Sequence, residues 1–236
     1  MKTLLLATAA MLALSGGASA AANPMAGAGA RGTAQHAVHA PPPGLATLYD
    51  QNIGDAGYGW FSQTLSSYPQ YDEYLADDFN VPAGHTWKVK EVDTTGFYYV
   101  GVGPASSVNV LFWKNKHNLP GAKAVECDNL IPKTGLDTGA FHIKLPKSCK
   151  VHLKGGASGA TYWVTVQANL AGLNSSGYWA WMQNVNGANN PGAGYYYGGG
   201  NSVFDPRCLQ QFEPIQDCWN AAGPVDLAFA LLGKDG

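Results

Sequence analysis

The stretch Thr161–Asn169, TYWVTVQAN, decides the fold, because its side chains alternate as those of a half-buried β-strand do. One face is predicted to point inward and carries Tyr162, Val164, Val166 and Ala168. The other face is predicted to point outward and carries Trp163, Thr165, Gln167 and Asn169. A strand of this kind needs neighbouring strands, so the rest of the chain should supply them.

The same period of two recurs in residues 107–113, 141–145 and 225–231. The residues expected to face inward are Val108, Val110, Phe112, Phe141, Ile143, Leu145, Val225, Leu227, Phe229 and Leu231. In the second of these segments, His142 falls on the outward face. The chain therefore contains several short strands of the same two-faced type.

Gly- and Pro-rich turns separate these strands, and charged residues make up only 13% of the chain. Many short strands between such turns predict an all-β protein, an antiparallel β-sandwich of jelly-roll-like type with long loops and little helix. Residues 189–201, NNPGAGYYYGGGN, are expected to form one of the long loops.

The first twenty residues have the pattern of a secretory signal peptide, with a basic start, an apolar run and a small-residue exit. Residues 21–46 are rich in Ala, Gly and Pro and are predicted to be a flexible leader. Residues 47–236 should form one β-sandwich domain. We therefore expect a secreted protein, extracellular or periplasmic, without a membrane span.

A formal net charge of -2 argues against nucleic acid as a partner. The four cysteines lack the C-x-x-C spacing of metal thiolates, so in an exported chain they favour disulfides. Of the three possible pairings, we expect Cys127 with Cys149 and Cys208 with Cys218, because each pair closes a local loop.

Eight blocks of the chain, in order, resemble a family of uncharacterised bacterial secreted proteins with a jelly-roll-like β-sandwich domain. They are ADDFNVPAGHTWKVKEVDTTG, GVGPASSVNVLFW, LPGAKAVECDNL, GAFHIKLP, TYWVTVQANL, GYWAWMQNV, NNPGAGYYYGGG and GPVDLAFALLG. The resemblance runs from about Leu48 to the C-terminus. It implies an exported sandwich module and brings no catalytic residues.

Residues 74–89, YLADDFNVPAGHTWKV, contain two adjacent carboxylates, Asp77 and Asp78. In a strand, successive side chains point to opposite faces, so this pair is not expected to line one pocket as a catalytic acid and base. Asp77 shares parity with Phe79 and should point inward, whereas Asp78 should point outward into solvent.

A buried carboxylate needs backbone donors, an Arg or a metal to offset its desolvation. A hydrogen-bonded structural role for Asp77 and a bound Ca²⁺ both stay open; for Ca²⁺, Asp77 and Asp226 are the candidate ligands. The sequence does not show that these two residues meet. No other cofactor is expected.

No catalytic residue can be assigned, since the chain has neither G-x-S-x-G nor H-E-x-x-H. His36 and His39 offer only two ligands and are taken as part of a solvated tail. A hydrolase built from dispersed carboxylates, among them Asp77, Asp78 and Asp226, remains an alternative because such sites assemble in space.

Aromatic residues beside amides and hydroxyls are the more informative feature, because a flat ring can cover the apolar face of a sugar while amides bond its hydroxyls. The candidate ligand-binding residues are Trp113, Trp163, Gln167, Trp179, Trp181, Tyr195, Tyr196 and Tyr197. Core packing is the alternative for each Trp. The leading hypothesis is a non-catalytic binding or adhesion module whose partner is a glycan or cell-surface polymer; a structural or protein-interaction surface component is the third.

Overall fold

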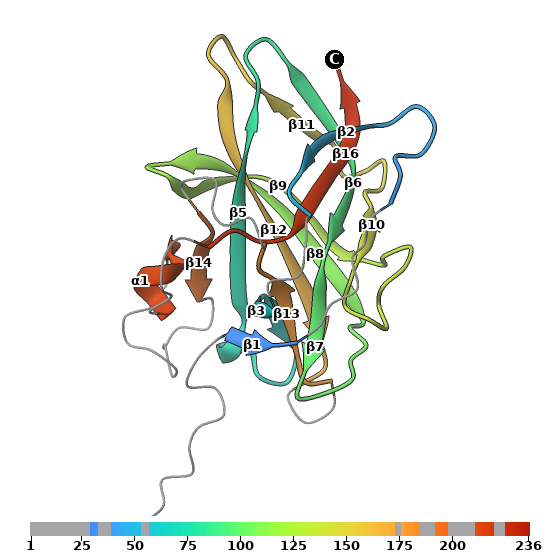
Figure 1. Cartoon of the computed structure of the whole chain (residues 1–236), viewed down its shortest axis with the longest axis vertical. Helices are drawn as coiled ribbons and strands as arrows, with labels where there is room; N and C mark the ends of the chain where they lie inside the picture. The colour runs from blue at the N-terminus through green and yellow to red at the C-terminus, as the bar shows by residue number, and fades with distance from the viewer. Residues whose placement is uncertain are drawn as a thin grey trace, which may run out of the picture.

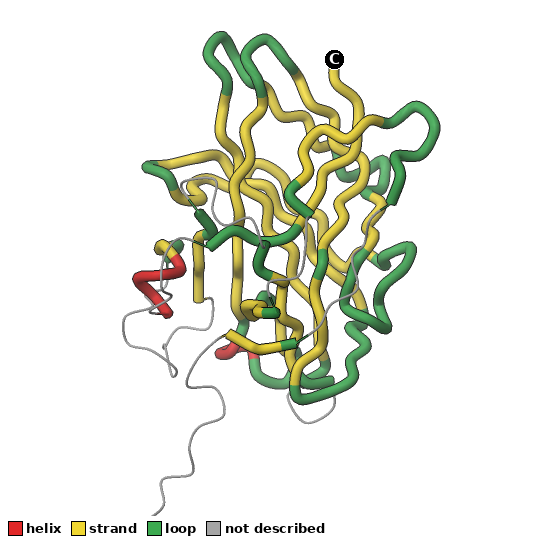
Figure 2. Tube along the Cα trace, in the orientation of Figure 1, coloured by secondary structure: helices red, strands yellow, loops and turns green. Residues whose placement is uncertain are grey.

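The computed structural model describes residues 29–32, 39–52, 57–172, 176–184, 192–197, 211–219 and 225–236. These residues form sheets that pack against one another and are nearly all antiparallel (Figure 1). Figure 2 shows how little of the described chain is helical: the 3₁₀ helix Pro69–Tyr71 and α1 (Ile215–Trp219). The predicted all-β sandwich is confirmed.

The largest sheet has seven strands and contains the stretch that defined the fold. Its order is β15 (Glu213–Pro214), β14 (Gly194–Tyr197), β5 (Glu73–Val81), β4 (Gln63–Leu65), β12 (Ala160–Leu170), β8 (Ser107–Lys116) and β9 (Leu119–Leu130). β12 also pairs directly with β5, which places Trp163 between Asp78 on one side and Trp113 on the other. β12 is therefore an interior strand of this sheet.

Two smaller sheets complete the described fold. The five-stranded sheet consists of β10 (His142–Lys144), β6 (Thr86–Thr94), β16 (Phe229–Asp235), β2 (Ala46–Asp50) and β11 (Val151–Lys154), which pairs with β6. The four-stranded sheet consists of β1 (Gly29–Arg31), β3 (Tyr58–Phe61), β13 (Tyr178–Met182) and β7 (Gly96–Tyr99). Because β1 pairs with β3, part of the predicted leader belongs to the fold.

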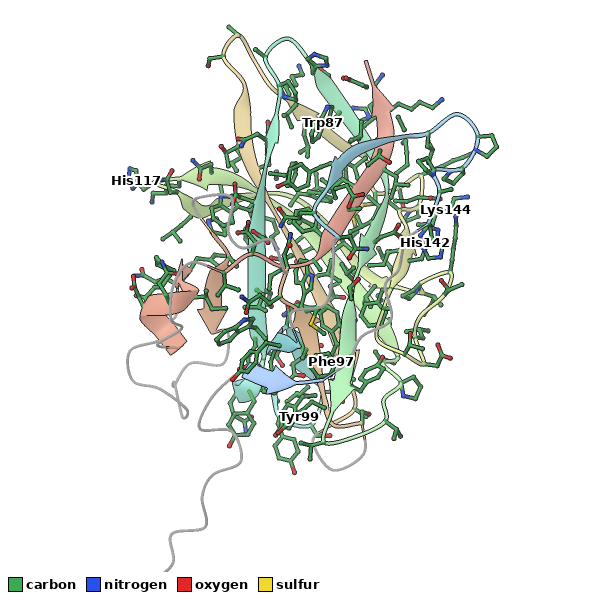
Figure 3. All side chains as sticks on the ribbon, viewed as in Figure 1. Trp87, Phe97, Tyr99, His117, His142 and Lys144 are labelled. Atoms are coloured by element: carbon green, nitrogen blue, oxygen red, sulfur yellow. A yellow bond between two sulfur atoms is a disulfide. The ribbon has the colours of Figure 1, made fainter. Side chains whose placement is uncertain are left out.

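The core is one cluster to which all three sheets contribute, and part of it lies between the seven-stranded and the five-stranded sheet. The ring of Phe79 on β5 lies 6.0 Å from those of Trp87 and Tyr49, and 6.3 Å from that of Phe229. Trp87, Tyr49 and Phe229 come from β6, β2 and β16, so one ring of the larger sheet contacts three strands of the smaller one. Figure 3 shows Trp87 among the packed side chains.

The inward faces predicted from alternation are confirmed. Val108, Val110, Phe112, Val164, Val166, Ala168, Phe141, Ile143, Leu145, Val225, Leu227, Phe229 and Leu231 are all buried. Only Tyr162, at the end of β12, is partly exposed. Alternation thus identified the face that each side chain occupies.

The predicted outward faces are wrong for Trp163, Thr165, Gln167 and His142, which are all buried. In β12, two of these side chains form hydrogen bonds to the neighbouring strands β8 and β5. The indole of Trp163 donates to Asn115 Oδ1 at 3.0 Å, and Gln167 Nε2 donates to the carbonyl of Glu73 at 2.9 Å. Alternation predicts a face but not whether that face is covered.

The predicted long loop at residues 189–201 is also wrong in part, because Gly194–Tyr197 form β14 and pair with β5. The side chains of Tyr195, Tyr196 and Tyr197 lie outside the described part of the structure. None of the helices in the described residues is long and apolar enough to cross a membrane.

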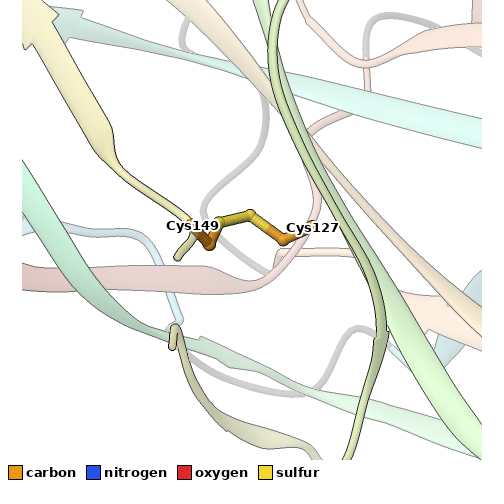
Figure 4. Close-up of a disulfide and its surroundings, with 2 residues drawn as sticks. All are labelled: Cys127 and Cys149. Atoms are coloured by element: carbon orange, nitrogen blue, oxygen red, sulfur yellow. A yellow bond between two sulfur atoms is a disulfide. The ribbon is translucent and has the colours of Figure 1, made fainter. Parts of the chain in front are cut away.

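One predicted disulfide, Cys127–Cys149, is confirmed, with 5.8 Å between the Cα atoms (Figure 4). Cys127 lies on β9 and Cys149 precedes β11, so the bond joins the seven-stranded to the five-stranded sheet. The other predicted pair cannot be placed, because Cys208 lies outside the described residues, which hold one disulfide.

Replacing both Cys127 and Cys149 by Ala should lower the free energy of unfolding by about 3 kcal/mol, because the bond closes a loop with a sequence separation of 22. Urea denaturation of the variant and of the oxidised wild type measures the difference. The reduced wild type should match the variant, and an unchanged unfolding midpoint would contradict the structural role.

Candidate functional site

Four of the predicted binding residues are buried in the core. Trp163, Trp179 and Trp181 have no exposed surface, and Gln167 is 1% exposed. The indoles of Trp179 and Trp181 donate to the carbonyls of Gly139 (2.8 Å) and Ala228 (2.9 Å). The prediction that these four residues lie on an exposed binding face is therefore wrong, and core packing applies to the three tryptophans.

Trp113 differs from them, because its half-buried ring lines an open cleft of about 670 Å³. Its indole N–H donates to Thr165 Oγ1 at 3.0 Å, and Phe212 meets its ring edge to face at 5.2 Å. Lys123 Nζ lies 5.9 Å from the ring centroid. The ring is thus fixed from several sides while part of its surface faces the cleft.

The Trp113 cleft lies between the β8–β9 hairpin and the segment that precedes β15. Its lining consists of Trp113, Lys116, His117, Leu119, Pro120, Gly121, Ala122, Gln211 and Phe212. His117 stands at the tip of the hairpin (Figure 3). The cleft combines apolar surface with several side chains that can form hydrogen bonds.

A second cleft, of about 690 Å³, is polar. Its floor holds a reciprocal amide pair in which Asn109 and Asn169 each donate to the other at 2.9 Å, and Thr64 donates to Asn169 Oδ1 at 2.7 Å. Glu126 and Asp128 also line it. We call it the amide cleft.

The amide cleft and the Trp113 cleft open on the same face of β8. Asn109 and Trp113 are four residues apart on a strand whose register with β12 is unbroken, so they share parity. At about 3.3 Å per residue, their Cα atoms are about 13 Å apart.

No family model, curated protein or solved structure matches this chain.

A third feature is a cluster of three carboxylates inside the molecule. One carboxylate oxygen each of Asp77, Asp78 and Asp226 lies within 4.8 Å of the others. All three residues are at most 1% exposed. Residues 225–228, which carry Asp226, cross β5 on the way to β16 (Figure 1), and this crossing brings the carboxylates together.

The prediction that Asp77 points inward is confirmed, and the prediction that Asp78 is solvated is wrong. Asp77 is inward and accepts hydrogen bonds from Gln51 Nε2 (2.7 Å), from the amide of Leu227 and from the amide of Asp78 (2.8 Å). Asp78, predicted to be solvated, is fully buried, and neither of its oxygens has a hydrogen-bond partner among the described residues. The two neighbours share one cluster despite the alternation of the strand.

Burial raises the pKa of Asp78 from its ordinary value of 3.8 to about 7, and the charge of Asp226 adds to this effect. The pKa of Asp77 is also well above its ordinary value, first because of burial and then because of Asp226. Because the three residues are at most 1% exposed, they are poor candidates for the hydrolase alternative.

Sequence patterns missed a second cluster, formed by His39, Asp93 and His142. His142 Nδ1 is hydrogen-bonded to Asp93 Oδ1, its cross-strand partner, and the ring of His39 stacks on that of His142 at 4.2 Å. Burial raises the pKa of Asp93, and the hydrogen bond from His142 opposes this. No sequence signal marks the pairing, because His142 and Asp93 are 49 positions apart.

In a buffer that contains a chelator, the free energy of unfolding should fall as the pH rises between 3.8 and about 7. In that interval folded Asp78 keeps its proton and unfolded Asp78 loses it, so the stability present at low pH is lost by up to about 1.4 kcal/mol per pH unit. Urea denaturation at each pH measures the slope. Asp78→Asn should have a shallower slope, and equal slopes would contradict the burial of an ionisable Asp78.

Proposed function

We propose that the protein is an exported, non-catalytic module that binds glycans, with the Trp113 cleft as its main contact. The observation that carries the proposal is the half-buried Trp113 ring in an open cleft of about 670 Å³. An indole covers the apolar face of a sugar ring, and neighbouring polar side chains bond its hydroxyls. The disulfide Cys127–Cys149 agrees with export.

The way in which Trp113 is held supports this role. Thr165 fixes the indole N–H, and Phe212 fixes the plane of the ring from the side. A ring already held in place loses little conformational freedom when a ligand stacks on it. Gln211, Lys116 and His117 supply hydrogen-bonding groups at the edge of the cleft.

The amide cleft lies on the same face of β8 as the Trp113 cleft and would enlarge the binding surface for a longer polymer. Its amides and hydroxyls can both donate and accept, as the hydroxyls of a glycan require. Since Asn109 lies about 13 Å from Trp113 along β8, a chain of several sugar units could contact both clefts at once.

Trp113→Ala should weaken binding to an immobilised polysaccharide by about tenfold or more, which equals about 1.4 kcal/mol. Pull-down with cellulose, xylan, chitin and peptidoglycan, followed by titration on the polymer that binds, measures the loss. Tyr99→Ala is the matched control, because Tyr99 is also a half-buried aromatic but lies on the four-stranded sheet. Binding to none of these polymers, or an equal loss in both variants, would refute the proposal.

A hydrolase at the amide cleft is the second candidate, and the presence of Glu126 and Asp128 there favours it. They lie two residues apart on β9, and glycosidases use a pair of carboxylates about 5 to 10 Å apart. The pKa of Asp128 is raised, first by burial and then by the charge of Glu126. Lys123 Nζ pairs with Glu126 at 2.5 Å.

Release of reducing ends from a bound polysaccharide distinguishes the two candidates. A non-catalytic module should release none. If wild type releases reducing ends, and Asp128→Asn and Glu126→Gln abolish this release while Asp137→Asn keeps it, the protein is a hydrolase instead.

For a protein-interaction surface the structure offers little, since the strongly exposed large hydrophobic side chains in the described part are only Val100, Val102 and Ile131.

A further inference from the structure

We propose that Asp77, Asp78 and Asp226 bind one Ca²⁺ ion that joins β5 to the segment leading into β16. This inference does not depend on the proposed glycan binding. It rests on two observations: three carboxylates within 4.8 Å of one another, and the buried side chain of Asp78, whose two oxygens have no hydrogen-bond partner among the described residues.

The first step is the charge of the cluster. The hydrogen bonds that Asp77 accepts come from one side-chain amide and two backbone amides, all neutral donors. These neutral donors satisfy the Asp77 carboxylate, but they bring no positive charge to offset the negative charge that the cluster carries when its carboxylates ionise. A divalent cation at the centre of the three oxygens offsets most of that charge.

The second step is the geometry of Asp78. A buried carboxylate loses its hydration, and this cost is normally offset by hydrogen bonds or by a cation. Asp78 is fully buried and has neither in the described residues, whereas Asp77 beside it has three hydrogen bonds. The Asp78 carboxylate is thus the group whose burial a bound cation would offset. Asp77 is the ligand whose position is fixed by hydrogen bonds.

The third step is the choice of metal. All three ligands offer only carboxylate oxygens, the donors preferred by hard cations and not by Zn²⁺ or Cu²⁺. Mg²⁺ usually keeps several waters and demands an octahedron, which a site at most 1% exposed does not favour. Ca²⁺ accepts irregular coordination by mono- and bidentate carboxylates, so it fits these residues best.

The position of the cluster gives the ion a structural effect. Asp77 and Asp78 belong to β5 of the seven-stranded sheet, and Asp226 belongs to the segment that leads into β16 of the five-stranded sheet. Leu227, next to Asp226, already donates its amide to Asp77 across a separation of 150 residues. A Ca²⁺ ion would strengthen this contact between the two sheets.

The full chain, stripped with EDTA and dialysed into metal-free buffer at pH 8, tests the proposal. Adding CaCl₂ to about 100 times its dissociation constant should raise the Tm by about 5 to 10 °C. Elemental analysis after removal of excess metal should find one Ca²⁺ per chain. No bound Ca²⁺ and no shift in Tm would overturn the proposal, as would a larger shift with MgCl₂ or ZnCl₂.

The variant Asp78→Asn gives a second test, because its stability relative to the wild type should change in opposite directions in EDTA and in CaCl₂. In EDTA at pH 8 the variant should be at least as stable as the wild type, because the buried carboxylate of Asp78 is replaced by a neutral amide. With CaCl₂ it should be the less stable protein, because it has lost a charged ligand. Asp137→Asn, at an exposed position, is the control and should keep the full response to Ca²⁺.

If Asp78→Asn does not fold, Asp226→Asn provides the same comparison, and the Ca²⁺ content of the wild type decides on its own. A variant of either residue that keeps the full shift in Tm would overturn the assignment to this cluster. Polysaccharide binding by the same samples is recorded separately, since its absence would refute the proposed function and leave the Ca²⁺ result unaffected.

Discussion

The packing of Phe79 between the two larger sheets is the contact on which the rest of the structure depends. Its ring meets Trp87, Tyr49 and Phe229, each from a different strand of the five-stranded sheet. Burying rings of this size is the main source of stability in a sandwich. Because side chains two positions apart share a face, the packing that buries Phe79 also buries Asp77, and a carboxylate must then be accommodated in the core.

The buried carboxylate of Asp77 is contacted by residues 226 and 227, which lie near the C-terminal end of the chain. Gln51 and the amide of Leu227 bond to Asp77, and the same crossing brings in Asp226. The result is a buried acidic cluster, well separated in role from the surface clefts. The proposed polymer-binding clefts and the proposed cation site therefore use different residues, so each proposal can be tested without the other.

The outer face of β8 shows how one strand can serve both the core and a surface. Leu111 is 2% exposed, whereas Asn109 and Trp113 on either side of it are only half-buried and line the two clefts. Of the aromatic residues chosen from sequence whose side chains the structure describes, only Trp113 lines one of these clefts. It lies near the end of its strand, where covering by neighbours is incomplete, while Trp163 is enclosed in the interior of the sheet.

The sequence by itself determined the alternating segments, their inward faces and the Cys127–Cys149 bond, because these follow from a local period of two and from a short loop. Only the tertiary structure decided which outward faces are covered, as for Trp163 and His142. It also decided that Asp226 meets Asp77 and Asp78. The physical reason is that covering and crossing depend on strand order and on contacts between distant segments, such as the 150 positions that separate Leu227 from Asp77, and no local pattern records them.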